Sequence, residues 1–158
     1  MEGVEQRPIE IVVRGLTPGD LDAVVAIDAK SAGRRREEYF RIKLRQNLAE
    51  TGIKVSLAAE ADGLFRGFLL ARVYYGEFGT MEPVAVLDTL GVHPDTRRLG
   101  IGHALMEQLL VNLAGLGVPT LRTEVAWEDT ELLAFFRRER FRPAARLCLE
   151  LPITHRVQ

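Results

Sequence analysis

The chain has little cysteine, almost no net charge and no long apolar run. Among its 158 residues there is a single cysteine, Cys148, so an internal disulfide is excluded. Cys148 stands in the apolar stretch Leu147-Cys148-Leu149, which favours a small buried side chain in a reducing compartment over a reactive thiol. Neither a disulfide scaffold nor a catalytic cysteine is expected.

The charges nearly cancel, with 21 Lys and Arg against 22 Asp and Glu and a net charge of −1. A protein that binds nucleic acid through its overall charge is strongly basic, so that class is excluded. Any site for a polyanion has to be local. The sequence also shows no grouping of Cys, His and Asp at the spacing of a metal site, and no metal is expected.

No apolar run approaches the roughly 20 residues that a membrane-spanning helix needs. The first residues, Met1-Glu2-Gly3-Val4-Glu5, lack the basic and then apolar order of a secretory signal. We therefore expect no membrane partner and a cytoplasmic location.

The length predicts one domain over residues 1–158, and 47% hydrophobic with 27% charged residues is typical of a soluble globular protein. Alternating and helical periodicities follow one another along the chain without an internal repeat. An Asp62-Gly63 pair between two strand-like runs predicts a hairpin. The pattern predicts strands at residues 9–13, 53–59, 64–73, 83–93, 121–127 and 145–151, and helices from about residues 21, 37, 100 and 130. This order predicts an α/β protein with a mixed sheet and helices on its faces.

The most informative segment runs from Asp88 to Leu105: a strand, a loop and an amphipathic helix. Free backbone N–H groups in the loop and first helical turn point toward one spot, which attracts phosphate. Gly100 and Gly102 let a phosphate approach the main chain, and Arg97 and Arg98 add positive charge. The alternative is a surface turn whose glycines serve geometry only. A dinucleotide fingerprint is excluded because its third glycine is Leu105, and the Gly-Lys-Ser/Thr ending of a Walker loop is absent.

The run Arg97-Arg98-Leu99-Gly100-Ile101-Gly102 is similar to the acetyl-CoA pyrophosphate motif of the GNAT N-acetyltransferase superfamily. The resemblance extends upstream to Val92-His93-Pro94 and downstream to a strand, a helix and Phe141, so that its core covers about residues 84–141. It implies a mixed, mostly antiparallel sheet of six to seven strands flanked by about four helices. In this fold the strand at 83–93 splays from its parallel neighbour at 121–127.

The resemblance also implies acetyl-CoA as cosubstrate and direct attack of an acceptor amine on the thioester. The backbone N–H of Leu90 is then the expected donor to the oxyanion. The residues expected to bind the cosubstrate are Leu90, Gly91, Val92, Arg97, Arg98, Leu99, Gly100, Ile101, Gly102 and His103.

An acceptor amine that is protonated near pH 7 needs a base, and Asp88 is the leading candidate. It interrupts an apolar strand face that it is expected to share with Leu90, although a carboxylate there can also pair with an arginine or cap a loop. Glu124, expected in the middle of the neighbouring strand, is the reserve candidate. Some family members place a glutamate two residues earlier, where this chain has Val86.

Two residues depart from the family's pattern. Phe136 stands where many members have a tyrosine that returns a proton to the leaving thiolate, and Arg140 stands in place of a glycine. A thiol pKa of about 8.5 still makes the thiolate a tolerable leaving group. The departure nevertheless keeps open a non-catalytic acyl-CoA sensor or interaction module.

The acceptor is expected to be a cationic amine, on a small molecule or on a protein. Between Val73 and Thr96 there is no Lys or Arg, whereas four carboxylates lead into the proposed acetyl site. The basic stretch around residues 34–45 is more typical of a solvated helix face than of an anion site. The oligomeric state stays open, with a homodimer as one option.

Overall fold

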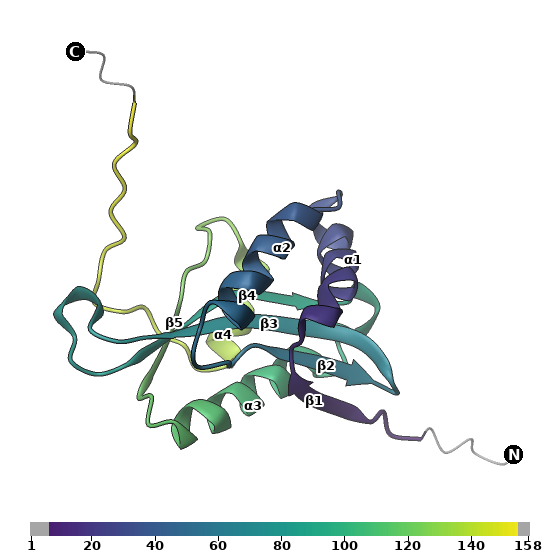
Figure 1. Ribbon diagram of the computed structural model, residues 1–158. Helices are drawn as coiled ribbons and strands as arrows, with labels where there is room; N and C mark the ends of the chain where they lie inside the picture. The colour runs from purple at the N-terminus through teal and green to yellow at the C-terminus, as the bar shows by residue number, and fades with distance from the viewer. Residues whose placement is uncertain (1–6, 155–158) are drawn as a thin grey trace, which may run out of the picture. The chain divides into compact units, whose positions relative to one another are not determined.

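The computed structural model describes residues 7–154 (Figure 1). Its elements in chain order are β1 (Ile11–Gly15), a 3-10 turn (Pro18–Asp20), α1 (Leu21–Ala32), α2 (Glu37–Leu44), a π-helical turn (Arg45–Ala49), β2 (Leu57–Ala61), β3 (Leu64–Tyr74), a 3-10 turn (Glu77–Gly79), β4 (Val84–Val92), a 3-10 turn (Pro94–Thr96), α3 (Ile101–Gly115), β5 (Thr120–Thr123) and α4 (Thr130–Arg138). The chain divides into two compact units, Met1–Glu124 and Val125–Gln158, which are described separately. One domain over residues 1–158 stays a prediction.

The first unit contains a mixed sheet in the order β1-β2-β3-β4-β5. The first three pairings are antiparallel and β4 pairs with β5 in parallel. Asp62 (φ 49°) and Gly63 (φ 79°) form the left-handed turn between β2 and β3, which confirms the predicted hairpin. The predicted α/β class and mixed sheet are confirmed, but the described residues hold five strands rather than six or seven.

The predicted strand at residues 145–151 is wrong, because no strand of the described chain pairs with this segment. Its alternating Leu147, Leu149 and Leu151 are 82–87% exposed, and Cys148 is exposed instead of buried. Alternation predicts burial of one face only where a neighbouring strand and a covering layer exist. Strand β5 likewise ends at Thr123, four residues before the predicted end at Trp127.

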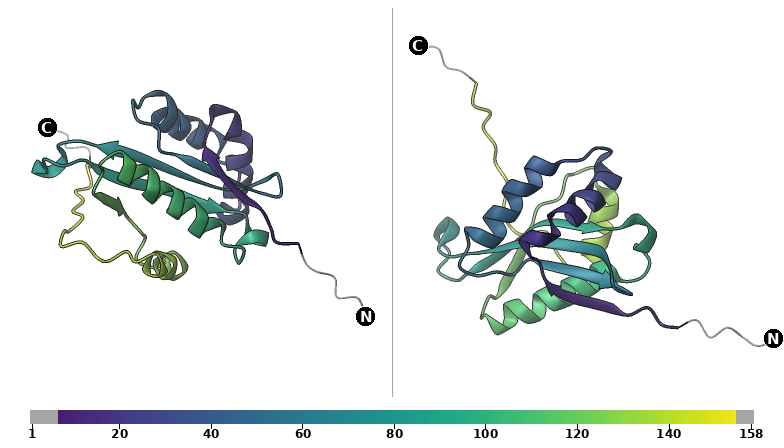
Figure 2. Two further views of the ribbon diagram at one scale, coloured as in Figure 1. Left: turned by 90° about the horizontal axis from the view of Figure 1, so that it is seen from below. Right: turned by 45° about the vertical axis from the view of Figure 1, so that its right-hand side comes forward.

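Two helical layers cover the sheet of the first unit, with α1 and α2 on one face and α3 on the other (Figures 1 and 2). Under α1 and α2, Phe40 and Phe68 pack edge to face with ring centroids 6.0 Å apart, and both are buried. The residues of this core are Leu16, Val24, Val25, Ile27, Phe40, Leu44, Leu48, Ala58, Phe68 and Leu70. On the opposite face α3 buries a stripe at four-residue spacing: Ile101, Leu105, Leu109 and Leu113.

A paired carboxylate joins β1 to α1. The guanidinium of Arg14 donates two hydrogen bonds of 2.8 Å to the carboxylate oxygens of Asp20, and the Thr17 backbone N–H donates a third of 2.8 Å. Asp20 is only 9% exposed. The Arg14 hydrogen bonds hold the pKa of Asp20 below its ordinary value of 3.8, against the opposing effect of burial.

Replacing Asp20 by Asn should lower the free energy of unfolding by about 2–3 kcal/mol at pH 7, because it removes the charge that accepts two short hydrogen bonds from Arg14 and leaves that guanidinium only the longer 3.2 Å contact with Glu60. The folded-state pKa is depressed, so the carboxylate contributes fully above its ordinary value and loses that contribution as the pH falls through the folded pKa. Denaturant unfolding of both proteins should therefore show a smaller difference below about pH 4 than at pH 7. Asp22→Asn, at an exposed acid in the first turn of α1, is the control. A difference that is constant with pH would show that the charge of Asp20 is not its source.

Candidate active site

Strands β4 and β5 pair over a short stretch and then part. Their parallel register runs from Val84 opposite Thr120 to Leu87 opposite Thr123. At the end of this stretch the Thr123 hydroxyl donates a 2.8 Å hydrogen bond to the backbone oxygen of Leu87. Strand β4 continues to Val92, and in the described chain its residues beyond Leu87 have no β5 partner. The predicted splay is therefore present, with the β5-facing edge of β4 open.

A β-bulge lies where the strands part. Leu87 is opposite Ala71 and Thr89 is opposite Leu70, so Asp88 is the extra residue in β4 without an opposite residue in β3. A bulge bends its strand and changes the direction of the side chains around it.

The bulge places Asp88 on the face covered by α2. One of its carboxylate oxygens lies 2.7 Å from Nζ of Lys43 on α2, and the Asp88 side chain is 33% exposed. Leu90 is opposite Leu69, which lies on the other face because its neighbour Leu70 belongs to the core under α1 and α2. The expectation that Asp88 and Leu90 share one face is wrong, since the bulge interrupts the alternation between them.

A second carboxylate stands near the same point. Because Leu87 and Thr123 are the last pair, the next residues along the chain are Asp88, still within β4, and Glu124, just after β5. Glu124 is exposed and directly follows β5, rather than lying in the middle of a strand as expected. Asp88, the candidate base, and Glu124, the reserve, thus both lie at the point where β4 and β5 separate.

The loop between β4 and α3 presents the start of a long helix. Gly100 is the N-cap of α3 with φ 82°, a left-handed conformation that glycine adopts without a steric cost. The N–H of Ala104 bonds to the oxygen of Gly100 at 2.9 Å, so helix geometry leaves the N–H groups of residues 101–103 without an acceptor inside the helix. Such donors and the positive end of a helix dipole attract an anion, as expected for this loop from the sequence.

Hydrogen bonds fix the loop that precedes the helix. The Asp95 backbone N–H donates to Nδ1 of His93 at 3.2 Å, and the Thr96 hydroxyl donates to the His93 backbone oxygen at 2.9 Å. The N–H of Leu99 donates to the oxygen of Thr96 at 3.0 Å. The backbone around Gly100 is thereby held in one conformation.

Two glycines of the sheet position this loop. A Cβ on Gly67 would lie 2.7 Å from Cγ2 of Ile101, so only glycine lets the start of α3 sit this close to β3. Gly67 is opposite Val92 at the end of β4. A Cβ on Gly91 would meet the ring of Phe68, so packing explains Gly91 whether or not it touches a cosubstrate. Sequence reasoning missed Gly67, because a single glycine in a strand gives no sign of what packs on it.

The predicted cosubstrate residues fall into two neighbouring groups. Leu90, Gly91 and Val92 lie on the open part of β4, and the other seven surround the start of α3. Arg97 and Arg98 are exposed. Ile101 is fully buried, so only its backbone can serve a ligand. His103 is exposed and lies 3.4 Å from Glu107 on the next turn of the helix.

The second unit contains α4 and the two departures from the family's pattern, Phe136 and Arg140. Helix α4 begins after Asp129, which caps it by accepting a 3.1 Å hydrogen bond from the Leu132 N–H. Phe136 is 5% exposed and packs against Phe141 with ring centroids 4.8 Å apart. Its ring carries no proton to give, and its role here is packing. Arg140 has φ 70°, the left-handed conformation that the family's glycine would adopt freely.

Replacing Arg140 by Gly should raise the free energy of unfolding by about 1 kcal/mol, because a left-handed conformation costs a non-glycine residue roughly 1–2 kcal/mol. Arg138→Gly is the matched control. That arginine lies in the last turn of α4, where glycine should lower stability by about 1 kcal/mol. Thermal unfolding of the three proteins measures both changes. Destabilisation by both variants would contradict a strained Arg140.

Within residues 7–154, no three His, Cys, Asp or Glu side chains lie close enough to hold a metal ion. None of the helices in this part of the chain combines the length and apolar character needed to cross a membrane.

A mixed sheet that opens between two parallel strands, beside the N-terminus of a glycine-capped helix, is the architecture that the resemblance of the motif implied. The sequence model of the Acetyltransferase (GNAT) family matches residues 21–140. The chain belongs to this family, as its motif predicted.

Relatives and solved structures agree with this membership. Mycothiol acetyltransferase from Clavibacter sepedonicus is 32% identical over 148 residues, which make up 90% of this chain and 46% of the relative. The chain thus spans about half the length of the curated relatives it matches. The fold is similar to that of aminoglycoside N-acetyltransferase AAC(6')-Iy in complex with CoA, with a TM-score of 0.77, 18% identity and coverage of 92% and 97% of the two chains. The ribosomal-protein-S18-alanine N-acetyltransferase from Escherichia coli has a TM-score of 0.70 and 26% identity, with 86% and 80% covered.

Proposed function

We propose that this protein is an acetyl-CoA-dependent N-acetyltransferase that transfers the acetyl group directly to a primary amine. One observation carries the proposal: β4 parts from β5 directly beyond Leu87, with Asp88 at the mouth of the opening and the Gly100-capped helix beyond it. Family membership and the names of the relatives support the same reaction class.

Each part of the cosubstrate has a fitting feature. The backbone N–H groups at the start of α3 would bind the diphosphate, with Arg97 and Arg98 adding charge. The open edge of β4 at Leu90 to Val92 would pair with the amides of the pantetheine arm. Bound acetyl-CoA supplies a thioester, and the Leu90 N–H is the donor proposed for the negative charge that develops on its oxygen.

Asp88 is the proposed base that takes the proton of the acceptor's ammonium group. The structure contains a close analogue of this contact, because the alkylammonium of Lys43 already lies 2.7 Å from the carboxylate. Glu124, the first residue past β5, is the reserve. The thiolate of CoA leaves without a tyrosine at position 136, which its pKa of about 8.5 permits.

The acceptor proposed is a cationic primary amine. The segment between Val73 and Thr96 contains no Lys or Arg of its own, but helix α2 places Lys43 beside Asp88 of this segment. The positive charge of Lys43 therefore partly neutralises the Asp88 carboxylate in the free protein. An acceptor ammonium therefore has to displace Lys43 or share Asp88 with it. One sequence relative is named mycothiol acetyltransferase, and one solved structure with a similar fold is named aminoglycoside N-acetyltransferase. These names suggest small amine-bearing molecules as the first acceptors to test. The single cysteine suits action in the cytoplasm.

The test is incubation with acetyl-CoA and a panel of aminoglycosides, cysteine-containing amines, polyamines and peptides with free N-termini. Release of the CoA thiol and the mass of the acetylated product are measured. At least one amine should accelerate thiol release above hydrolysis. Tight CoA binding without transfer to any acceptor would instead support the acyl-CoA sensor, which Phe136 in place of tyrosine favours.

A further inference from the structure

Lysine is scarce in this chain, and one lysine lies on the candidate base. Three of the 21 Lys and Arg residues are lysines, namely Lys30, Lys43 and Lys54. Lys30 and Lys54 are exposed, whereas the Lys43 side chain is 24% exposed and contacts the Asp88 carboxylate at 2.7 Å. A lysine amine that gives up its proton is a nucleophile, whereas an arginine keeps its charge in proteins. An arginine would also pair with Asp88, so the ion pair alone does not require a lysine at position 43.

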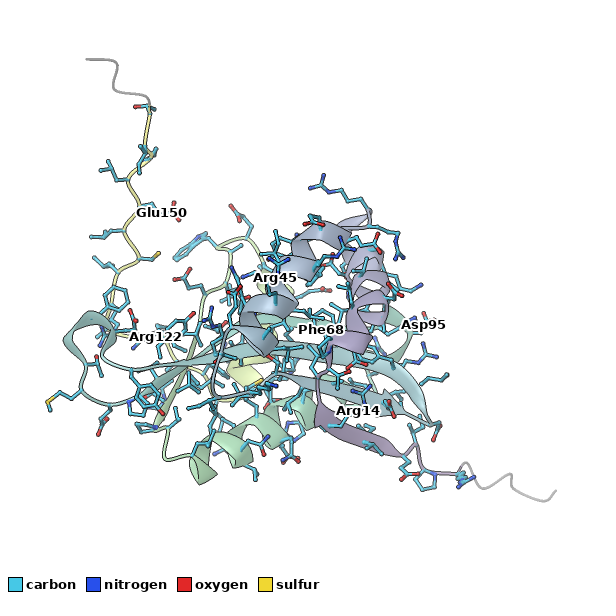
Figure 3. All side chains as sticks on the ribbon, in the orientation of Figure 1. Arg14, Arg45, Phe68, Asp95, Arg122 and Glu150 are labelled. Carbon is cyan, nitrogen blue, oxygen red and sulfur yellow. The ribbon has the colours of Figure 1, made fainter. Side chains whose placement is uncertain are left out.

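The fold holds Lys43 in place. Lys43 lies in the last turn of α2, and the side-chain amide of the buried Asn47 donates a 2.8 Å hydrogen bond to the Lys43 backbone oxygen. The ring of Tyr39, one turn earlier on α2, has its centroid 5.9 Å from Nζ of Lys43 and attracts a cation through its π face. In Figure 3, Arg45 at the end of α2 and Phe68 of β3 mark this face of the sheet.

The same contact places the Lys43 amine near the proposed site of the thioester. A general base has to lie within about 2.6–3.2 Å of the atom that carries the proton, and Nζ of Lys43 meets this distance to Asp88. A strand rises about 3.3 Å per residue, so the Leu90 N–H, the donor proposed for the thioester oxygen, lies within about 7 Å of Asp88 along β4. The flexible four-carbon stem of lysine lets Nζ move over part of this distance.

We infer that Lys43 is a self-acetylation site, whose amine takes the acetyl group of acetyl-CoA bound to the same chain. The inference rests on the proposed acetyl transfer and names one acceptor for it. The Lys43 ammonium gives one proton to the Asp88 carboxylate, and the neutral nitrogen attacks the carbonyl carbon of the thioester. A C–N bond forms, the C–S bond breaks with its electron pair going to sulfur, and the second proton of the nitrogen ends on the CoA thiolate. The products are an acetylated Lys43, the CoA thiol and a proton that Asp88 returns to water.

Tethering makes Lys43 a strong competitor for the acetyl group. An amine attached to the site by a short flexible link has an effective concentration in the millimolar range. Acetylation then removes the positive charge of Lys43, and with it the ion pair. Asp88 thereby loses the cation that an incoming acceptor ammonium has to displace.

Mass spectrometry after incubation with acetyl-CoA and no added amine tests the inference. The purified chain should gain one acetyl group, and peptide mapping should place it on Lys43. The rate per molecule should not change on dilution, because the reaction takes place within one chain. Lys30 and Lys54 report the uncatalysed reaction of acetyl-CoA with exposed amines. Lys43 should react at least about 10²-fold faster than either, the lower end of the usual contribution of a general base. Equal rates at the three lysines would overturn the inference.

Substitutions identify the nitrogen and the base. Lys43→Arg should keep its circular dichroism spectrum and take up no acetyl group, whereas Lys30→Arg, the matched control in α1, should be acetylated at the parent's rate. Asp88→Asn should slow the acetylation of Lys43 to the rate at Lys54. An acetyl group already present on Lys43 of the purified parent and absent from purified Asp88→Asn counts as the same result. Acetylation of Lys43 at the parent's rate in Asp88→Asn would contradict the inference.

The panel of added amines separates this inference from the proposed function. Acetylation of an added amine by a protein whose Lys43 stays unmodified would overturn self-acetylation and leave the proposed function intact. Acetylation of Lys43 with no added amine accepted would support the inference and count against transfer to a free acceptor. A protein that releases no CoA thiol under either condition would overturn both.

Discussion

Replacing Asp88 by Asn should lower kcat/KM for acetyl transfer to a primary amine by about 10²- to 10⁴-fold at neutral pH, the usual contribution of a general base, if Asp88 takes the proton as proposed. An alkylamine with a pKa of about 10.4 is almost fully protonated at pH 7, and only its neutral form attacks the thioester. Asp88 lies at the bulge where β4 parts from β5 and already holds an alkylammonium at 2.7 Å. The amide of asparagine has the same shape but does not take the proton.

The pH profile separates loss of a base from loss of structure. The defect of Asp88→Asn should shrink as the pH rises toward the pKa of the acceptor amine, because the amine then needs no base. The broken ion pair with Lys43 should itself cost about 0–1 kcal/mol of stability, and the Kd for CoA should stay unchanged. Asp22→Asn, at an exposed acid in the first turn of α1 and outside the acidic stretch between Val73 and Thr96, is the control with normal activity. If Asp88→Asn has normal activity and Glu124→Gln has a greatly reduced kcat/KM, then Glu124 and not Asp88 is the general base.

Replacing Gly100 by Asn should raise the Kd for CoA by about 10- to 100-fold, which corresponds to losing roughly one hydrogen bond to a charged group. A Cβ on Gly100 meets nothing within 4 Å, so the protein itself has room for the new side chain, which is added at the helix start where the diphosphate is proposed to bind. Asparagine is chosen because it tolerates the left-handed conformation of this position, φ 82°. The fold should survive while the anion site is obstructed.

Gly117 is a matched control at the other end of the same helix. It also has a left-handed conformation, φ 71°, and a Cβ there also meets nothing within 4 Å. Gly117→Asn should therefore cost similar stability, about 1 kcal/mol, and leave the Kd for CoA unchanged. Calorimetric titration of the three proteins with CoA measures the difference. Equal affinities in all three would refute a diphosphate site at the start of α3.

The local features of the candidate site were predictable from sequence. The loop from Arg97 to Gly102 and the helix after it are specified within one continuous stretch, through two glycines and a stripe of apolar residues at helical spacing. The Asp62-Gly63 turn is equally local, because its conformation is set by two residues. These features do not depend on partners elsewhere in the chain.

The features that relate distant segments were not predictable. The bulge at Asp88 arises from register between β3 and β4, and a shift of one residue moves a side chain to the other face of a sheet. The contact of Lys43 with Asp88 joins residues 45 positions apart in sequence through the packing of α2. No periodicity in a single stretch encodes either arrangement.

The amino-acid sequence by itself determined the family, the glycine-containing loop that leads into α3, and the alternation of Leu147, Leu149 and Leu151, because each depends only on residues close together in the chain. Only the tertiary structure decided that Asp88 faces α2, that Glu124 stands just past the end of β5, and that Leu147, Leu149 and Leu151 lie exposed. The physical reason is that a side chain's face and burial depend on which strand or helix packs against it, and that partner is fixed by the whole fold.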